Sequence, residues 1–116
     1  MNTTQSFPRC VRLTEGRDYR QVYAGAKRSS DQIFAVAWVP GKVEYGARLG
    51  LAVSRKCARR AVDRQRIKRI VRESFRQARI RLPAVDIVVS CRVGTARRGN
   101  RELRRSLESH WSRLNR

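Results

Sequence analysis

Residues 55–81 read RKCARRAVDRQRIKRIVRESFRQARIR, a stretch with twelve Lys or Arg but only two acids, Asp63 and Glu73. At about 100° per residue, one sector of this segment is apolar and most of the cations fall opposite it. The apolar sector consists of Ile67, Ile70, Val71, Ser74, Phe75 and Ala78. The pattern predicts a long helix that begins between Ala58 and Arg64, docks by one face and shows cations on the other.

The composition indicates one small folded domain that binds a polyanion. The 116 residues include 41% hydrophobic side chains, which is typical of a folded chain, yet the net charge is +19 and the pI about 11.7. So large a positive charge repels itself unless nucleic acid lies against it. We expect residues 1–10 to form a loose N-terminal arm and residues 11–116 to form a single domain that binds nucleic acid.

The cysteines and the apolar runs bear on the cell compartment. Cys10, Cys57 and Cys91 are odd in number and show no metal-binding spacing with the single histidine, His110. Residues 1–12 lack the apolar core of a signal peptide, and the longest apolar run, 33–39, is too short to cross a membrane. We therefore expect three reduced, unreactive thiols in a cytoplasmic protein without a membrane partner.

Periodicity predicts the other elements of the fold. They are a short helix capped by Thr14, strands at residues 32–39, 48–54 and 86–93, and a final helix capped by Asn100. We predict a basic turn at residues 27–31 and antiparallel pairing of the first two strands. Trp38 and Trp111 are assigned to the core. The fold class is α+β, a single compact domain with a small, mainly antiparallel sheet packed by helices.

No catalytic constellation is visible. The carboxylates are scattered without the paired spacing that holds two metal ions, and residues 94–99 lack the ending of a nucleotide-binding loop. His110 has no nucleophile beside it and is interpreted as a partly exposed surface residue. Asp63 fits a helix cap, although an acid beside phosphate-binding arginines could also help to hold hydrated Mg²⁺. We expect no catalytic residue and no metal site in this chain.

Three aromatic side chains leave two interpretations open. Tyr19, Tyr23 and Phe34 have a spacing that is usual for core residues. The strand that bears Phe34 is apolar on both faces, however, so one face could instead be a platform for unstacked bases.

The segment RQRIKRIVRESFR, residues 64–76, closely resembles the signature of the bacterial ribonuclease P protein component. The resemblance extends to RLGLAVSRK at residues 48–56, LPAVDIVV at residues 82–89 and the helix from Asn100 to Trp111. It covers nearly the whole chain, from Arg12 to Arg113.

This resemblance implies an accessory subunit of an endoribonuclease. Members of the family assist a catalytic RNA that removes the 5′ leader from precursor tRNA by hydrolysis, with Mg²⁺ bound mainly by the RNA. The implied partners are the ribonuclease P RNA subunit and precursor tRNA, without a small-molecule substrate. The implied fold contains a left-handed βαβ crossover, against the usual right-handed rule.

The resemblance also implies two RNA-binding surfaces. By matching position, contact with the catalytic RNA falls to Arg64, Gln65, Arg66, Lys68, Arg69 and Arg72. The leader-binding cleft falls to Tyr19, Tyr23, Phe34 and, at its edge, Lys56. Gln65 stands where the family motif has Asn, so the same amide is carried on a longer side chain.

Two other classes share parts of this pattern. A ribosomal or rRNA-binding structural protein has the same size and charge but would not affect leader removal. A DNA-binding architectural protein would lay the long helix in a major groove, usually as a dimer. No helix-turn-helix pair or dimer seam is evident in the sequence.

Overall fold

The computed structural model describes residues 27–114. Its elements are β1 (Lys27–Ser30), β2 (Phe34–Pro40), η2 (Val43–Tyr45), β3 (Arg48–Ala52), α2 (Ala61–Ala78), η3 (Arg79–Arg81), β4 (Val85–Cys91), η4 (Thr95–Arg97) and α3 (Asn100–Leu114). The predicted arm, residues 1–10, and the helix expected after Thr14 lie outside the described residues. No helix within the described range is both long enough and apolar enough to cross a membrane.

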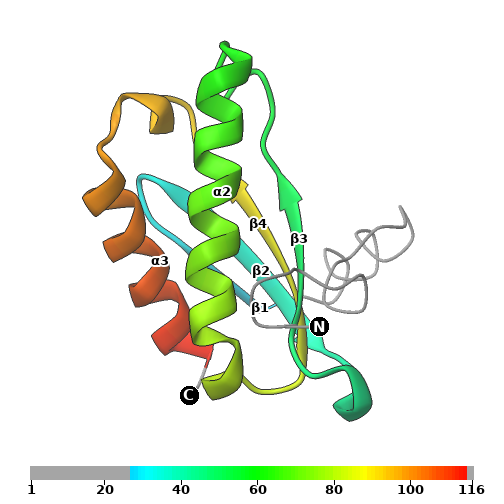
Figure 1. Cartoon of the computed structure of the whole chain (residues 1–116). Coiled ribbons are helices and arrows are strands. Elements are labelled where there is room, and N and C mark those ends of the chain that lie inside the picture. Colours follow the sequence, from blue (N-terminus) through cyan, green and yellow to red (C-terminus); the bar gives the residue numbers. More distant parts are fainter. Residues whose placement is uncertain (1–26, 115–116) are drawn as a thin grey trace, which may run out of the picture.

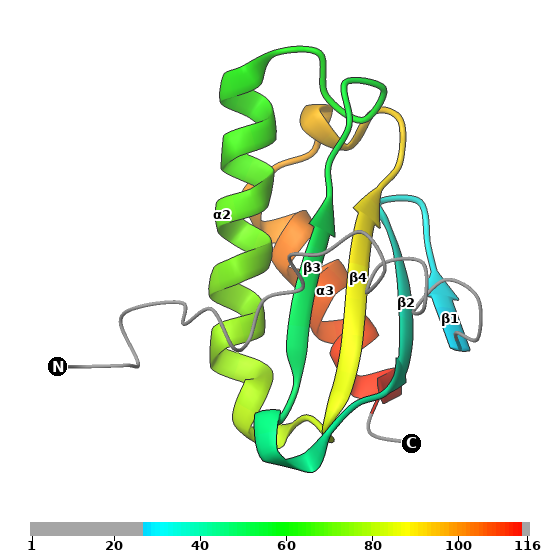
Figure 2. The same cartoon turned by 90° about the vertical axis from the view of Figure 1, so that its right-hand side faces the viewer.

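A four-stranded mixed sheet forms one layer, and both helices cover the same face of it (Figures 1 and 2). The strand order is β1-β2-β4-β3. β2 pairs antiparallel with β1 and β4, whereas β3 pairs parallel with β4. The predicted α+β class with a mainly antiparallel sheet is confirmed.

Two details of the predicted sheet were wrong. The strands at 34–40 and 48–52 do not pair, because β4 lies between them. Residues 27–30 are an edge strand and not a turn, and only Ser29 of this strand is buried. An edge strand that is largely exposed carries little apolar alternation, so its sequence resembles that of a polar turn.

The connection from β3 through α2 to β4 is left-handed, as the resemblance implied. With both strands pointing up and α2 in front of the sheet, β4 lies to the left of β3 (Figure 1). In Figure 2, turned by 90°, the strands read β3, β4, β2 and β1 from left to right, with α3 behind them. The crossover carries the chain away from the sheet and back along α2, whose N-terminal end follows directly on the basic loop after β3.

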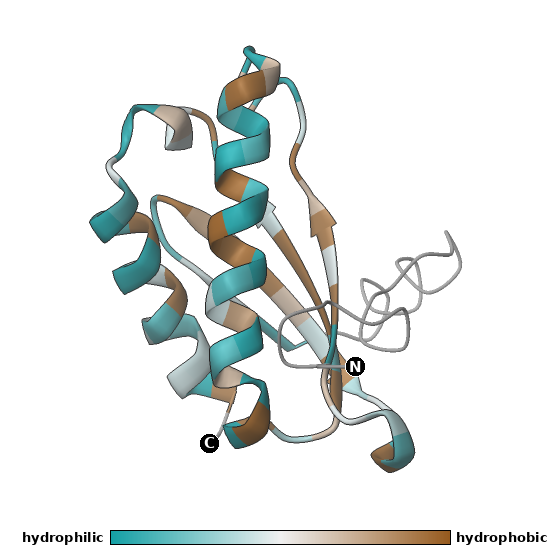
Figure 3. Ribbon diagram, in the orientation of Figure 1, coloured by the Kyte–Doolittle hydropathy of each residue, from teal (hydrophilic) through white to brown (hydrophobic). Residues whose placement is uncertain are grey.

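The core lies between the sheet and the two helices. All six residues of the predicted apolar sector of α2 are buried, and Figure 3 shows hydrophobic and hydrophilic positions alternating along that helix. Trp111 of α3 makes an edge-to-face contact with Phe75, with ring centroids 5.9 Å apart, and its indole N–H donates to Ser74 Oγ at 2.8 Å. These contacts hold α2 against α3. Because the apolar side of α2 faces the core, its cationic side faces outward.

Candidate nucleic-acid interface

The residues predicted to contact RNA occupy the sides of α2 that do not face the core. Gln65 and Arg69 are exposed, and the other four are half-buried. The four are Arg64, Arg66, Lys68 and Arg72. The sequence pattern therefore placed these side chains correctly on the helix, and the structure shows that Arg64 and Arg66 bind other parts of the chain.

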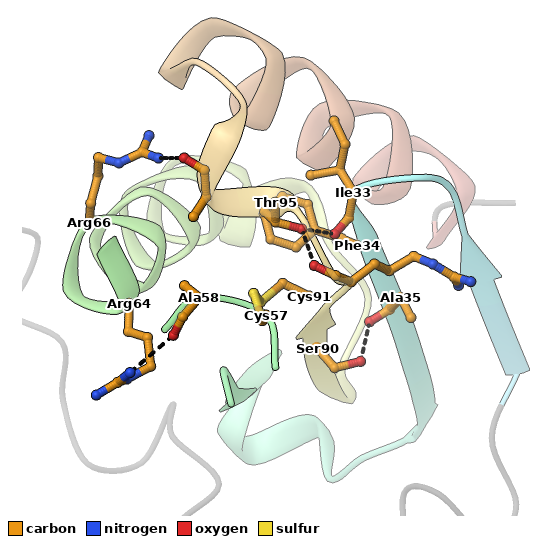
Figure 4. Close-up of a disulfide and its surroundings, with 12 residues drawn as sticks. Ile33, Phe34, Ala35, Cys57, Ala58, Arg64, Arg66, Ser90, Cys91 and Thr95 are labelled. Atoms are coloured by element: carbon orange, nitrogen blue, oxygen red, sulfur yellow. Dashed lines mark hydrogen bonds between the residues drawn. A yellow bond between two sulfur atoms is a disulfide. The ribbon is translucent and has the colours of Figure 1, made fainter. Parts of the chain in front are cut away.

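Arg64 folds back onto the loop that precedes its own helix. Its Nη1 donates to the backbone carbonyl of Ala58 at 3.0 Å and to that of Arg59 at 2.7 Å (Figure 4). The N-cap residue of α2, Arg60, makes no side-chain capping bond. Arg64, in the first turn of α2, thus fixes the loop that leads into the helix.

Arg66 reaches across to the loop after β4. Its Nη2 donates to the carbonyls of Ala96 at 2.9 Å and Arg98 at 3.3 Å, and its Nη1 donates to Asn100 Oδ1 at 2.5 Å. Asn100 was expected to cap α3, and its side-chain oxygen instead receives this arginine. One guanidinium therefore links α2 to η4 and to the first residue of α3.

The two loops held by these arginines enclose a basic pocket, which we call the loop pocket. It has a volume of about 1090 Å³ and lies between residues 55–60 and residues 93–97. Its cations are Arg55, Lys56, Arg59, Arg60 and Arg97, and Asp63 is the one acid among its lining residues. A hollow with five cations and one acid attracts anions strongly. The sequence indicated a basic loop at residues 94–99 but did not show that it faces residues 55–60.

A disulfide joins the loop at residues 55–60 to the last residue of β4. Cys57 and Cys91 are bonded, with Cα atoms 5.7 Å apart, which is the usual separation for such a bond (Figure 4). The prediction of three reduced thiols is therefore wrong for these two residues. A separation of 34 residues hides the pairing from any spacing rule, since it depends on how β3 and β4 lie side by side.

The predicted leader cleft is only partly visible. Tyr19 and Tyr23 lie outside the described residues. Phe34 is 0% exposed in the core cluster, so it cannot offer its ring to a base in this structure, and the core interpretation holds for it. Lys56 is exposed and lines the loop pocket. The side chain of Phe34 packs in the core between the sheet and the helices, and contact of Phe34 with the leader stays a prediction.

His110 is fully buried, not at the surface as predicted. Arg113 Nη1 donates to Ser29 Oγ at 2.6 Å, and Ser29 Oγ lies 2.7 Å from His110 Nδ1. Which of these two atoms donates depends on the tautomer of His110. Nε2 lies 3.2 Å from Asp31 Oδ2 without hydrogen-bond geometry. The group ties α3 to the turn between β1 and β2.

Burial governs the charge of this group. Burial lowers the pKa of His110 below its usual 6.5, and nearby Arg113 lowers it further, although Asp31 acts in the opposite direction. Burial alone would raise the pKa of Asp31, but hydrogen bonds from Ser106 and from the backbone N–H groups of Phe34 and Ile33 outweigh it. The pKa of Asp31 therefore lies below 3.8. A neutral histidine beside an ionised carboxylate is the stable state near neutral pH.

The described residues offer chemistry suited to binding anions. Among residues 27–114, no group of three or more His, Cys, Asp or Glu side chains could hold a metal ion. Asp63 lies in the first turn of α2 and is not its cap, since Arg60 holds that position. Guanidinium groups arranged around a hollow bind phosphates, so the surface suits a nucleic-acid backbone.

Sequence comparison relates the chain to one family. Residues 7–115 match the family described as Ribonuclease P. The ribonuclease P protein component of Thioalkalivibrio sulfidiphilus is 53% identical over 114 residues, covering 98% of this chain and 94% of the relative. That of Methylococcus capsulatus is 46% identical over 110 residues, covering 95% and 85%.

Solved structures show the same fold. The RNase P protein of Staphylococcus aureus superposes with a TM-score of 0.78 at 28% identity, covering 90% of this chain and 94% of that one. The RNase P protein of Thermotoga maritima gives a TM-score of 0.75 at 30% identity, covering 89% and 96%. The likeness therefore covers nearly the whole chain.

Proposed function

The chain belongs to the ribonuclease P protein family, and we propose that it binds the catalytic RNA of that enzyme and the 5′ leader of precursor tRNA. In this role it aids the endonucleolytic removal of the leader that forms the mature 5′ end of the tRNA. The observation that supports this most is the joining of a cation-rich helix to a basic hollow on a chain of net charge +19.

Two surfaces divide the work in this proposal. The outward side of α2, with Gln65, Lys68, Arg69 and Arg72, lies against the catalytic RNA together with the loops that Arg64 and Arg66 hold. The leader is bound by Tyr19 and Tyr23 with Lys56 at the edge of their cleft. Stacking suits an unpaired leader because every base has a π-face, whatever its sequence.

The protein contributes positive charge where two polyanions meet. Precursor tRNA and the catalytic RNA repel each other, and each phosphate neutralised by an Arg or Lys releases bound counterions. The described carboxylates do not form a metal site, so we assign the Mg²⁺ used in hydrolysis to the RNA subunit. The chain's own residues bind and orient the two RNAs, which should lower the concentration of Mg²⁺ that the RNA needs.

The test is leader removal from precursor tRNA by a bacterial ribonuclease P RNA at limiting Mg²⁺, with and without this protein. We expect strong stimulation that declines when the leader is trimmed to one or two nucleotides. Protein alone with precursor tRNA and Mg²⁺ is the control and should give no cleavage. Tight RNA binding without stimulation would overturn the proposal and favour a ribosomal type of RNA-binding protein.

A further inference from the structure

We propose that the loop pocket is a preformed seat for the phosphate backbone of the catalytic RNA, and that Arg64 and Arg66 hold its walls without contacting phosphate themselves. The contacts would come from Arg55, Arg59, Arg60 and Arg97. This inference rests on the proposed function, because it takes the catalytic RNA as the polyanion. It differs from the division of roles expected from the motif, in which Arg64 and Arg66 touch the RNA.

Both terminal nitrogens of the Arg66 guanidinium already donate hydrogen bonds within the protein. Three acceptors, the carbonyls of Ala96 and Arg98 and the Oδ1 of Asn100, receive its two terminal nitrogens. A bidentate contact with a phosphate uses the same fork of donors. To make it, Arg66 would have to abandon carbonyls that are half-buried, and these would then lack a partner.

Arg97 lies, in the sequence, between the two residues whose carbonyls bind Arg66. Its neighbours in the chain, Ala96 and Arg98, both accept from Arg66 Nη2, while the side chain of Arg97 is exposed and lines the loop pocket. Arg64 acts in the same way on the facing loop, because it binds the carbonyls of Ala58 and Arg59. We call Arg64 and Arg66 latches, because each binds backbone carbonyls of one loop and so fixes an exposed arginine there. Arg64 fixes Arg59, and Arg66 fixes Arg97.

Other bonds fix the walls of the pocket from behind. Thr95 Oγ1 lies 2.9 Å from the carbonyl of Ile33 and 2.6 Å from that of Arg92, and the Cys57–Cys91 bond joins the loop at residues 55–60 to the end of β4. Gly94, with a φ of 89°, adopts the left-handed conformation that turns the chain into η4. Walls set before binding reduce the ordering that the RNA must impose, which favours tight association.

The charge and size of the pocket fit several phosphates, not one. Within the described part of the chain, Arg55, Arg59 and Arg97 have no ion-pair partner, and Arg60 has only a 4.0 Å contact with Asp63. A hollow of about 1090 Å³ has room for more than one phosphate group. Val93, 80% exposed at the rim, adds an apolar contact for a ribose or base.

Salt dependence separates a phosphate contact from a latch. We would measure the Kd of the full-length protein for a bacterial ribonuclease P RNA over a series of KCl concentrations at fixed Mg²⁺. Each lost phosphate contact lowers the slope of log K against log salt by about 0.7 to 0.9. Arg59→Ala and Arg97→Ala should each lower the slope by this amount. The control, Arg81→Ala at the far end of α2 in η3, should leave it unchanged.

Arg66→Lys is the decisive variant, because Lys keeps the charge but cannot serve three acceptors with a fork. We expect binding about tenfold weaker, as for the loss of one bond to a charged group, with the wild-type slope. Wild-type affinity in Arg66→Lys, with a lower slope in Arg66→Ala, would make Arg66 a phosphate contact and overturn the latch.

Arg59→Ala and Arg97→Ala test whether the loop pocket binds phosphate, independently of the role of Arg66. Both side chains are exposed, so these variants should fold, and thermal unfolding followed by circular dichroism checks this. Wild-type slopes in both would mean that the loop pocket does not bind RNA. Failure of the unmodified protein to bind the RNA subunit at moderate salt is a different result, which would refute the proposed function itself.

Discussion

The loop pocket and the contact between α3 and β1 are both held by polar side chains, but they treat charge in opposite ways. At the loop pocket, Arg64 and Arg66 remain charged, lie near the surface and donate to backbone carbonyls. At the α3–β1 contact, His110 is fully buried and neutral, and only its neighbours Asp31 and Arg113 carry charge near the solvent.

The difference shows how a chain of net charge +19 stays folded. Charged side chains at the surface stay solvated in the free protein, and salt screens their mutual repulsion until a polyanion binds. A charge left in the interior would have no such relief. Cohesion therefore has to come from the neutral interior, and we expect variants there to change stability, whereas variants of the exposed pocket arginines change RNA binding.

The largest effect on stability should come from Trp111→Ala. Trp111 is 2% exposed, contacts Phe75 edge to face and donates to Ser74. Its loss leaves a cavity and an unpaired hydroxyl, so the free energy of unfolding should fall by about 3–5 kcal/mol. Urea unfolding measures this change. Arg101→Ala, on the exposed side of the same helix, should stay within about 0.5 kcal/mol of the wild type.

If Trp111→Ala and Arg101→Ala proved equally mild, the interior would not be the source of cohesion. The comparison between a neutral core and a charged surface would then lose its basis.

The next largest effect concerns the loop pocket. Reduction of the Cys57–Cys91 bond, which closes a loop of 34 residues, should lower the free energy of unfolding by about 2–4 kcal/mol. Thiol titration in denaturant without reductant should find one free thiol per chain, that of Cys10, and three after reduction. Cys10→Ser is the control and should give none and then two.

Three thiols before reduction would instead support the reduced state that the cysteine spacing suggested. In that case the latches of Arg64 and Arg66 and the bond of Thr95 would have to hold the loop pocket without a covalent link.

The fold was predictable where the pattern is local. The buried stripe of α2 follows directly from 3.6-residue periodicity, and β2 and β4 follow from continuous apolar runs. The order of the strands was not predictable in this way. β4 lies between β2 and β3. Strand order depends on contacts between segments far apart in the sequence, and periodicity does not contain that information.

The candidate site shows the same division. That Arg64 and Arg66 lie off the buried stripe follows from the helix itself. That Arg66 binds carbonyls 30 and 32 residues away follows only from the packing of η4 beside α2. His110 was misplaced for a related reason. A histidine in a basic helix has the pattern of a surface residue. Its partner, Ser29, lies on β1, which the sequence pattern predicted as a turn, so the buried contact could not be foreseen.

The smallest effect should be the response of the α3–β1 contact to acid. The folded-state pKa of His110 is lowered, so between pH 6.5 and that value the unfolded chain takes up a proton that the folded chain refuses. Stability should be full above pH 6.5 and decline as the pH falls, by no more than about 1.4 kcal/mol per pH unit for one proton. Chemical unfolding at a series of pH values measures this slope.

The control separates His110 from Asp31, which faces it. The pKa of Asp31 lies below 3.8, so its contribution is retained above 3.8 and is lost only in stronger acid. His110→Gln keeps a group that can bond Ser29 but cannot titrate, so its stability should be lower overall yet independent of pH from 6.5 down to about 4. A wild-type chain without any slope in that interval would mean that His110 accepts a proton while folded. The buried contact would then tolerate charge much as the loop pocket does, and the contrast between the two regions would be one of exposure alone.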